Sequence, residues 1–163
     1  TELGREAVQE ARALVAGRAR IAEDSLDRAL AVLAERFGRE TGVAVGVEAA
    51  GAAPLPREAE VVLLRAAQEA LANIRKHSGA ARARLALDVG DAWARLTVSD
   101  DGRGLSESQA AGRGGFGLAG LADRVRLAGG EFAVRSGGPA PWTGAVLTVR
   151  LPVPADPGDG SGP

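Results

Sequence analysis

Two neighbouring segments of the chain alternate between apolar and polar residues: ARARLALDV (81–89) and AWARLTVSD (92–100). A period of two is typical of strands that bury one face of a sheet. Gly90–Asp91 lies between them, and this dipeptide is a hairpin turn signal. We therefore predict an antiparallel strand pair in the middle of the fold, which the remaining elements have to cover.

The rest of the chain supplies four segments with helical composition or spacing and three more segments that alternate like strands. The predicted helices are 1–22, 26–39, 56–77 and 116–127, and the additional strands are 43–49, 131–136 and 145–151. This order predicts an α+β fold, a two-layer sandwich whose mixed, mostly antiparallel sheet carries its helices on one face. It argues against a doubly wound parallel sheet.

The composition excludes several classes of function. The chain has 163 residues, enough for one domain, and 45% of them are hydrophobic. Aromatic residues make up only 3%, so the core is expected to consist of Val, Leu and Ala. The absence of cysteine excludes disulfides and thiol catalysis, and the single histidine, His77, leaves little for a His-based metal pair or a catalytic triad. A net charge of −1 gives no support to non-specific nucleic-acid binding.

The helix predicted over 56–77 carries a polar stripe. Glu69, Asn73, Lys76 and His77 stand at helical spacing, on a different side from its apolar residues. An amide oxygen is a ligand for Mg²⁺, a carboxylate one turn earlier can act as a base, and a cation can meet phosphate. A solvated helix face, a favourable cation at the helix C-terminus for Lys76 and a capping role for His77 are the alternatives.

Two glycine-rich segments follow. SDDGRGL (99–105) ends a strand with the pattern D-x-G-x-G, in which Asp100 could accept a hydrogen bond from an exocyclic amine and glycine lets the backbone approach a ligand. An ordinary Asp-Gly turn is the alternative. GFGLAG (115–120) satisfies G-x-G-x-x-G, but it follows a long loop and lacks the acidic residue of the dinucleotide fingerprint. A glycine-rich helix start that could receive phosphate remains.

The order and spacing of these motifs resemble the ATP-binding catalytic domain of sensor histidine kinases, within the Bergerat fold shared with gyrase, Hsp90 and MutL ATPases. The GLAGLADRV helix and the LAGGEFAV and TVRLP segments look like the nitrate-sensor and desaturase-sensor branch. The resemblance implies an ATP-binding catalytic domain over 25–152. It implies that 1–24 are the end of a dimerisation and phosphoacceptor hairpin, and we expect a disordered tail over 153–163.

By this resemblance Asn73 ligates a Mg²⁺ that bridges the triphosphate, and Glu69 is the base or positioning group toward the accepting histidine. Lys76 and His77 lie near the phosphates. Asp100 accepts the adenine amino group.

The glycines complete the implied ATP site. Gly102 and Gly104 shape the wall beside adenine, and residues 105–114 form a lid. Gly115, Gly117 and Gly120, with Leu118 in the same motif, admit the phosphates to the helix start.

Two departures from the family pattern stand out. The Gly-Thr pair usual before the last strand is Gly144–Ala145 here, with Thr143 displaced, so a hydroxyl contact near adenine is lost or reassigned. A phosphoacceptor histidine is missing, because His77 falls within the nucleotide motif. The accepting residue is therefore expected upstream of Thr1, in a longer parent.

The implied partners are the parent's own dimerisation and phosphoacceptor helices and the receiver domain of a response regulator. The resemblance implies a homodimeric parent whose catalytic domain is cytoplasmic and which could be anchored in the cell membrane, whereas the fragment could be a monomer. Two other classes remain: an ATP-binding regulatory module or anti-sigma-type serine kinase, and an ATP-operated clamp of the gyrase or MutL sort.

Overall fold

The computed structural model describes residues 25–51, 55–105 and 116–153. In chain order the elements in these ranges are α2 (Leu26–Thr41), β1 (Ala44–Ala50), α3 (Arg57–Asn73), the π-helical turn η1 (Ile74–Ser78), β2 (Arg82–Val89), β3 (Trp93–Asp100), α5 (Phe116–Leu127), β4 (Glu131–Ser136) and β5 (Ala145–Pro152). Every helix and strand predicted within these ranges is present, with bounds that differ by two residues or fewer, except at the end of α3. The helix predicted over 1–22 lies outside the described residues.

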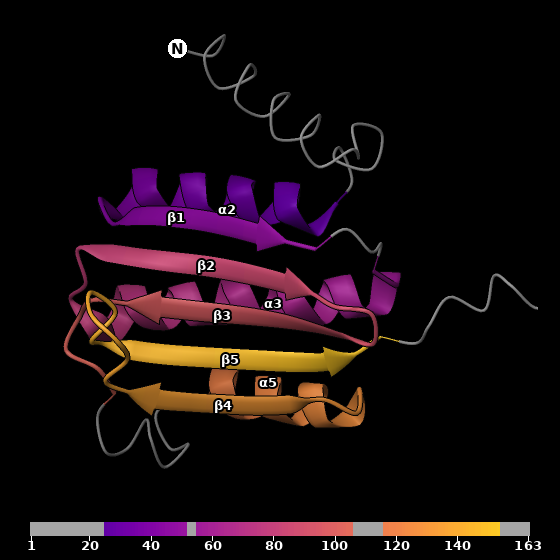
Figure 1. Cartoon of the computed structure of the whole chain (residues 1–163). Coiled ribbons are helices and arrows are strands. Elements are labelled where there is room, and N and C mark those ends of the chain that lie inside the picture. Colours follow the sequence, from indigo (N-terminus) through magenta and orange to yellow (C-terminus); the bar gives the residue numbers. More distant parts are fainter. Residues whose placement is uncertain (1–24, 52–54, 106–115, 154–163) are drawn as a thin grey trace, which may run out of the picture.

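The five strands form one mixed sheet in the order β1-β2-β3-β5-β4 (Figure 1). β2 and β3 pair antiparallel on either side of the Gly90–Asp91 turn, as predicted. β5 pairs antiparallel with both β3 and β4. β1 lies parallel to β2, because α3 connects the two strands as a crossover.

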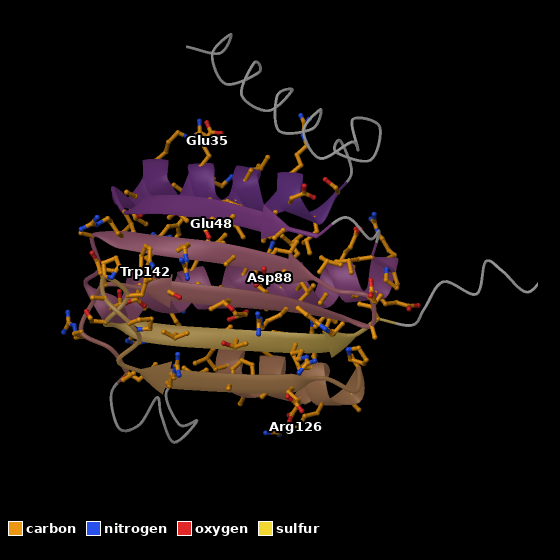
Figure 2. The ribbon with its side chains drawn as sticks, in the orientation of Figure 1. Glu35, Glu48, Asp88, Arg126 and Trp142 are labelled. Atoms are coloured by element: carbon orange, nitrogen blue, oxygen red, sulfur yellow. The ribbon has the colours of Figure 1, made fainter. Side chains whose placement is uncertain are left out.

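The helices cover one face of this sheet and leave the other face open (Figure 1). α2 packs against β1, α3 against β3 and β5, and α5 against β4 and β5. Figure 2 views the open face, where Glu48, Asp88 and Trp142 carry their side chains. The predicted α+β two-layer sandwich is therefore confirmed.

Leucine, valine and alanine build the core between the two layers, as the scarcity of aromatics predicts. The largest fully buried apolar side chains are all leucines and valines, among them Leu63 and Leu71 of α3. Alanines complete the buried stripe of α3 and let the helix approach the sheet closely. The two tryptophans belong elsewhere: Trp93, for example, lies beneath the guanidinium groups of Arg95 and Arg150, 5.3 Å from each.

The polar stripe of α3 ends in a different winding from the predicted α-helix. After Asn73 the chain forms the π-helical turn η1, which Gly79 closes in the left-handed conformation. A π-turn holds more residues per turn than an α-turn, and its last residue here, Ser78, is buried. Such turns are frequent at functional sites.

The packed region extends slightly beyond the predicted domain end. Val153, the first residue of the predicted tail, is buried, and its N–H donates to the Ala92 carbonyl oxygen at 2.9 Å. Among the described helices, none combines the length and apolar character that crossing a membrane requires.

Candidate functional site

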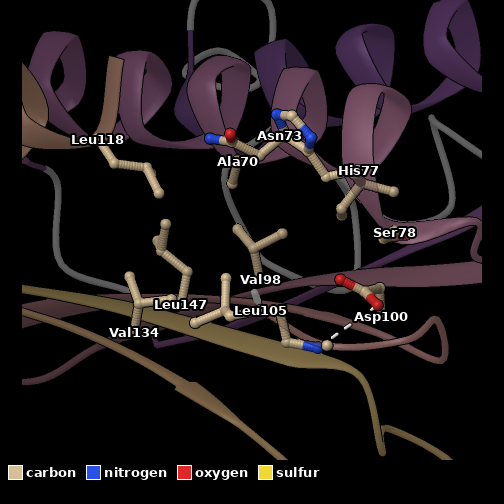
Figure 3. A pocket seen from close by; sticks show the side chains of 13 residues that line it. Ala70, Asn73, His77, Ser78, Val98, Asp100, Leu105, Leu118, Val134 and Leu147 are labelled. Atoms are coloured by element: carbon tan, nitrogen blue, oxygen red, sulfur yellow. Dashed lines mark hydrogen bonds between the residues drawn. The ribbon is translucent and has the colours of Figure 1, made fainter. Parts of the chain in front are cut away.

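A pocket opens between the helical layer and the sheet, at the end where α3 passes into η1 (Figure 3). It encloses about 410 Å³, including its open mouth, and most of its lining is apolar. The lining residues are Ala70, Asn73, Ile74, His77, Ser78, Val98, Asp100, Gly104, Leu105, Leu118, Val134, Ala145 and Leu147. All three predicted motifs therefore contribute to one cavity, although they lie far apart in the sequence.

Asp100 is the buried charge of this pocket, with 1% of its surface exposed. Its Oδ1 accepts the Gly102 N–H at 2.8 Å and the Ala145 N–H at 3.4 Å. Burial raises the pKa of the Asp100 carboxyl, and these two N–H groups partly counteract the shift. In the described residues both hydrogen bonds end on Oδ1, which leaves Oδ2 for a donor that enters the pocket, and Figure 3 shows this carboxylate at the rim of the cavity.

The neighbouring Asp101 fixes the strand end that carries Asp100. Its Oδ1 accepts the N–H groups of Ala81 and Arg82, both at 2.9 Å, and so ties the start of β2 to the end of β3. The Arg82 N–H is the largest cause of a lowered pKa of the Asp101 carboxyl, since it stabilises the charged form. This residue was not predicted to matter, because its partners come from another strand.

The loop after β3 packs onto η1. Arg103 N–H donates to the Ser78 carbonyl oxygen at 2.9 Å. A Cβ on Gly102 would lie 2.3 Å from that oxygen, so a side chain at this position would push the loop away. Gly104 lines the pocket with a φ of +81°, a conformation that favours glycine. Both predicted loop glycines thus help to form one wall.

Asn73 faces the pocket from the last turn of α3, and its Nδ2 donates to the Glu69 carbonyl oxygen at 2.9 Å. This bond orients the amide and leaves Oδ1 as an acceptor. Within the described residues, no group of three or more His, Cys, Asp or Glu side chains is arranged to hold a metal ion. A Mg²⁺ fits here only in the way that it is commonly held beside nucleotides, with one protein oxygen and the remaining ligands from phosphate and water.

The start of α5 lies against Glu69. A Cβ on Gly117 would come within 2.2 Å of Glu69 Oε2, so the missing side chain makes room for this carboxylate. Leu118 lines the pocket, whereas Gly120 is exposed and has open space where a Cβ would stand. Gly115 and residues 106–114 of the predicted lid lie outside the described residues.

The two cationic candidates of the stripe differ in position. His77 is exposed but contributes to the pocket lining, whereas Lys76 is exposed and is not among the lining residues. Sequence reasoning missed Ser78 and the apolar strand residues Val98, Val134 and Leu147. The strand residues could have been found from the sequence, because every second residue of an alternating strand faces the core. Ser78 is predicted only as the end of the helix.

Gly144 matches the glycine of the Gly-Thr pair that is usual before the last strand, and its position explains why glycine stands there. A Cβ at Gly144 would lie 2.1 Å from Asp100 Oδ1, so glycine permits β5 to approach the carboxylate. Ala145 lines the pocket, while Thr143 is exposed and lies outside the lining. The hydroxyl group of Thr143 therefore does not replace the one that a threonine at 145 would supply.

Comparison with known proteins gives a consistent result. A family model described as "Histidine kinase-, DNA gyrase B-, and HSP90-like ATPase" matches residues 58–155. The sensor histidine kinase MctS of Rhizobium johnstonii is 33% identical over 143 residues, which are 85% of this chain and 30% of that protein. The sensor histidine kinase YhcY of Bacillus subtilis is 31% identical over 151 residues, 93% of this chain and 38% of that protein. The chain thus spans about a third of the length of these curated relatives.

Solved structures show the same fold. The histidine kinase domain of a blue-light activated histidine kinase from Erythrobacter litoralis superposes with a TM-score of 0.63 at 25% identity, over 79% of this chain and 61% of that chain. The ATP-binding domain of PrrB from Mycobacterium tuberculosis gives a TM-score of 0.55 at 27% identity, over 80% of this chain and 93% of that chain. The family match covers α3, the Asp100 loop and α5, which are the elements that form the pocket. This chain belongs to the histidine kinase-, DNA gyrase B- and HSP90-like ATPase family.

Proposed function

We propose that the pocket binds ATP with Mg²⁺ and that the chain is the catalytic domain of a two-component sensor histidine kinase. Its reaction is the transfer of the γ-phosphoryl group of ATP to a histidine outside this chain. Such a transfer depends on positioning and electrostatic stabilisation more than on covalent chemistry by the protein. The residues of the pocket can be assigned on that basis.

The observation that carries the proposal is a buried carboxylate at the rim of an apolar pocket. The flat, apolar faces of adenine suit walls made by Val98, Val134 and Leu147. Asp100 Oδ2 accepts a hydrogen bond from the exocyclic amino group. Guanine carries a carbonyl oxygen at that position, so the same carboxylate would repel it.

Asn73 and Glu69 serve the reacting end of the nucleotide. Asn73 offers its Oδ1 to Mg²⁺, because its Nδ2 is already bonded to the helix. When bound, Mg²⁺ would supply positive charge that offsets the charge of the phosphates during transfer. Glu69 holds its carboxylate beside Gly117, where it orients or deprotonates the accepting imidazole.

The remaining candidates contact the phosphates. His77 approaches from the η1 side of the pocket, and Lys76, which precedes it in η1 and lies outside the lining, adds a positive charge. By the family motif, Gly115, Gly117 and Gly120 admit the phosphates, as glycines near a helix start can do. Leu118 lines the pocket and is the apolar contact.

The proposal extends to a longer parent protein, since the curated relatives are about three times as long as the matched region. In that parent, residues 1–24 end a helical hairpin that dimerises and carries the phosphorylated histidine, and 25–152 form the catalytic domain. The receiver domain of a response regulator accepts the phosphoryl group next. The parent is a homodimer, anchored in the membrane or cytoplasmic, with this domain in the cytoplasm.

The alternatives have less support. MctS and YhcY are named as histidine kinases, which disfavours the ATP-binding regulatory module and the anti-sigma-type serine kinase. A clamp of the gyrase or MutL sort would need a further transducer domain with a catalytic lysine.

The proposal is tested by mixing this chain with the separately expressed upstream hairpin of its parent and γ-labelled ATP. We expect Mg²⁺-dependent labelling of the hairpin with the acid lability of phosphohistidine. Asn73→Asp should reduce the labelling rate by about tenfold or more, because a carboxylate at this position repels the phosphates.

Gln68→Glu is the matched control, since it makes the same change from amide to carboxylate at an exposed position of the same helix. It should label at the wild-type rate. Equal rates for the two variants would contradict the metal role of Asn73, and acid-stable label on a serine of a separate regulator would support the alternative function instead.

A further inference from the structure

The base end of the pocket carries a hydroxyl group that the sequence motifs did not identify. Ser78 lines the pocket from η1 and has 5% of its surface exposed. Its Oγ accepts the Ala80 N–H at 3.0 Å, which fixes the orientation of the side chain. A serine hydroxyl has one O–H to donate besides its acceptor sites, so this contact leaves the proton available to a ligand.

Ser78 and Asp100 converge on the same glycine. Gly102 N–H donates to Asp100 Oδ1 at 2.8 Å, while a Cβ on Gly102 would lie 2.8 Å from Ser78 Oγ. Figure 3 shows Ser78 on the helical side and Asp100 on the sheet side of one end of the pocket. A flat ring inserted at this end would therefore meet a carboxylate and a hydroxyl group along one edge.

That pairing matches the edge of adenine. The 6-amino group is a donor, and the adjacent ring nitrogen N1 is an acceptor. We propose that Ser78 donates its hydroxyl proton to adenine N1, directly or through one water molecule, while Asp100 accepts from the amino group. This inference rests on the proposed ATP-binding function and assigns a specificity residue within it.

The other polar side chains of the lining are less suited to this role. Asn73 donates one N–H of Nδ2 to the Glu69 carbonyl oxygen and is only partly buried, and His77 is exposed. The Ala145 N–H is directed at Asp100 Oδ1, and Ala145 has no hydroxyl group of its own. Within the described lining residues, Ser78 is thus the buried side chain that has a hydroxyl proton to donate.

The π-turn places Ser78 beside the loop that follows β3. In η1 its side chain faces the pocket, and its carbonyl oxygen accepts the Arg103 N–H at 2.9 Å from the loop after β3. The same winding therefore positions both the hydroxyl group and the loop that holds Asp100.

The test compares the binding of ATP and of 1-deaza-ATP, which carries C–H in place of N1, by calorimetry with the whole chain. The wild type should bind ATP about 3- to 10-fold more tightly, the range expected for one net hydrogen bond. Ser78→Ala should bind the two ligands within about twofold of each other. A purely structural role of Ser78 would weaken both ligands equally and preserve their ratio.

Two further variants secure the result. Ser78→Cys keeps the shape of the side chain but has a weak donor, so its preference for ATP should also shrink even if Ser78→Ala fails to fold. Ser99→Ala removes another buried serine that does not line the pocket, and it should keep the wild-type ratio. A wild-type ratio in Ser78→Ala and Ser78→Cys, or a wild type that does not discriminate, would overturn the inference while leaving ATP binding intact. A chain that binds neither ligand would overturn the proposed function itself.

Discussion

Asp100 and Asp101 are neighbours in the chain, but they face opposite sides of the end of β3. Their surroundings shift the pKa values of the two carboxyls in opposite directions. Asp100 points toward the pocket, where burial raises the pKa of its carboxyl. Asp101 turns toward the start of β2, where the Arg82 N–H is the largest cause of a lowered pKa. A carboxylate surrounded by N–H groups stabilises structure, whereas one that is buried with an acceptor oxygen still available is prepared for a ligand.

The same contrast recurs in the second glycine motif. Gly117 lies against the Glu69 carboxylate, whereas Gly120, three residues later in the same helix, has open space around it. In both motifs two near neighbours therefore have different surroundings. A residue's place in a motif therefore does not establish its function, which depends on what its side chain contacts.

Asp100→Asn is expected to have the largest effect. The substituted amide can present an N–H₂ group to the adenine amino group, so the affinity for ATP should fall by about 100-fold or more, equal to ~2.7 kcal/mol. Circular dichroism should be unchanged, since Asn Oδ1 can still accept the Gly102 N–H. Calorimetric titration with ATP measures the loss, and wild-type affinity in this variant would contradict the assignment of Asp100.

Asp101→Ala should produce the complementary result. Removing the acceptor of the Ala81 and Arg82 N–H groups should lower the free energy of unfolding by about 1–2 kcal/mol, because both amides lie near the surface and find water. Urea denaturation measures this change. In the folded fraction the affinity for ATP should stay within about threefold of the wild type. A loss of ATP binding without a loss of stability would remove the contrast between the two acids.

Much of this arrangement could be predicted from local sequence. The alternation of 81–89 and 92–100 gave the central hairpin, and the spacing of Glu69 and Asn73 put both on one side of α3. These features follow from periods of 2 and 3.6 residues, which act over short distances.

Features that depend on distant contacts could not be read in this way. The parallel pairing of β1 with β2 and the insertion of β5 between β3 and β4 are set by strands far apart in the chain. The carbonyl oxygen of Ser78 in the π-turn accepts the Arg103 N–H from the loop after β3, and the role of Asp101 depends on N–H groups at the start of β2. Each of these is a tertiary contact without a periodic signature.

Gly117→Ala tests the contrast between Gly117, which lies against Glu69, and Gly120, which has open space beside it. The new Cβ would overlap the Glu69 carboxylate, which is the flexible end of a side chain and can move aside. The fold should therefore keep its stability, while phosphoryl transfer to the separate hairpin should slow by about tenfold, because Glu69 loses its position. Labelling rates with γ-labelled ATP measure the effect.

Gly120→Ala makes the identical change where the structure has space, so it should slow transfer less than Gly117→Ala does. It should also raise the free energy of unfolding by about 0.5–1 kcal/mol, because alanine favours a helix interior over glycine. If both variants slow transfer equally, the contact with Glu69 is not what requires glycine at position 117.

The pH dependence of binding and stability is expected to give the smallest effect. In it the contributions of Asp100 and Asp101 to stability should change in opposite directions as the pH falls. Asp100 must be ionised to accept the amino group, and its folded pKa lies above the ordinary value of 3.8. As the pH is lowered, the affinity for adenosine, which carries no phosphate to titrate, should therefore begin to fall while the pH is still above 3.8. It should be reduced about twofold where the pH equals the raised pKa of the Asp100 carboxyl. Protonation also removes a buried charge, so the contribution of Asp100 to stability rises as the pH falls through that value.

Asp101 behaves in the reverse sense, because its folded pKa lies below 3.8. The stability that it contributes is fully present above the unfolded value and is lost only as the pH falls through the lowered folded value. Adenosine binding should thus weaken at a higher pH than the one at which Asp101 stops supporting the fold. In the Asp101→Ala variant the binding curve should move toward lower pH, because the charge of Asp101 is one of the causes that raise the pKa of the Asp100 carboxyl. Titrations of binding and of unfolding over the same pH range measure both curves. If the affinity for adenosine stays constant as the pH is lowered to 3.8, burial does not raise the pKa of the Asp100 carboxyl.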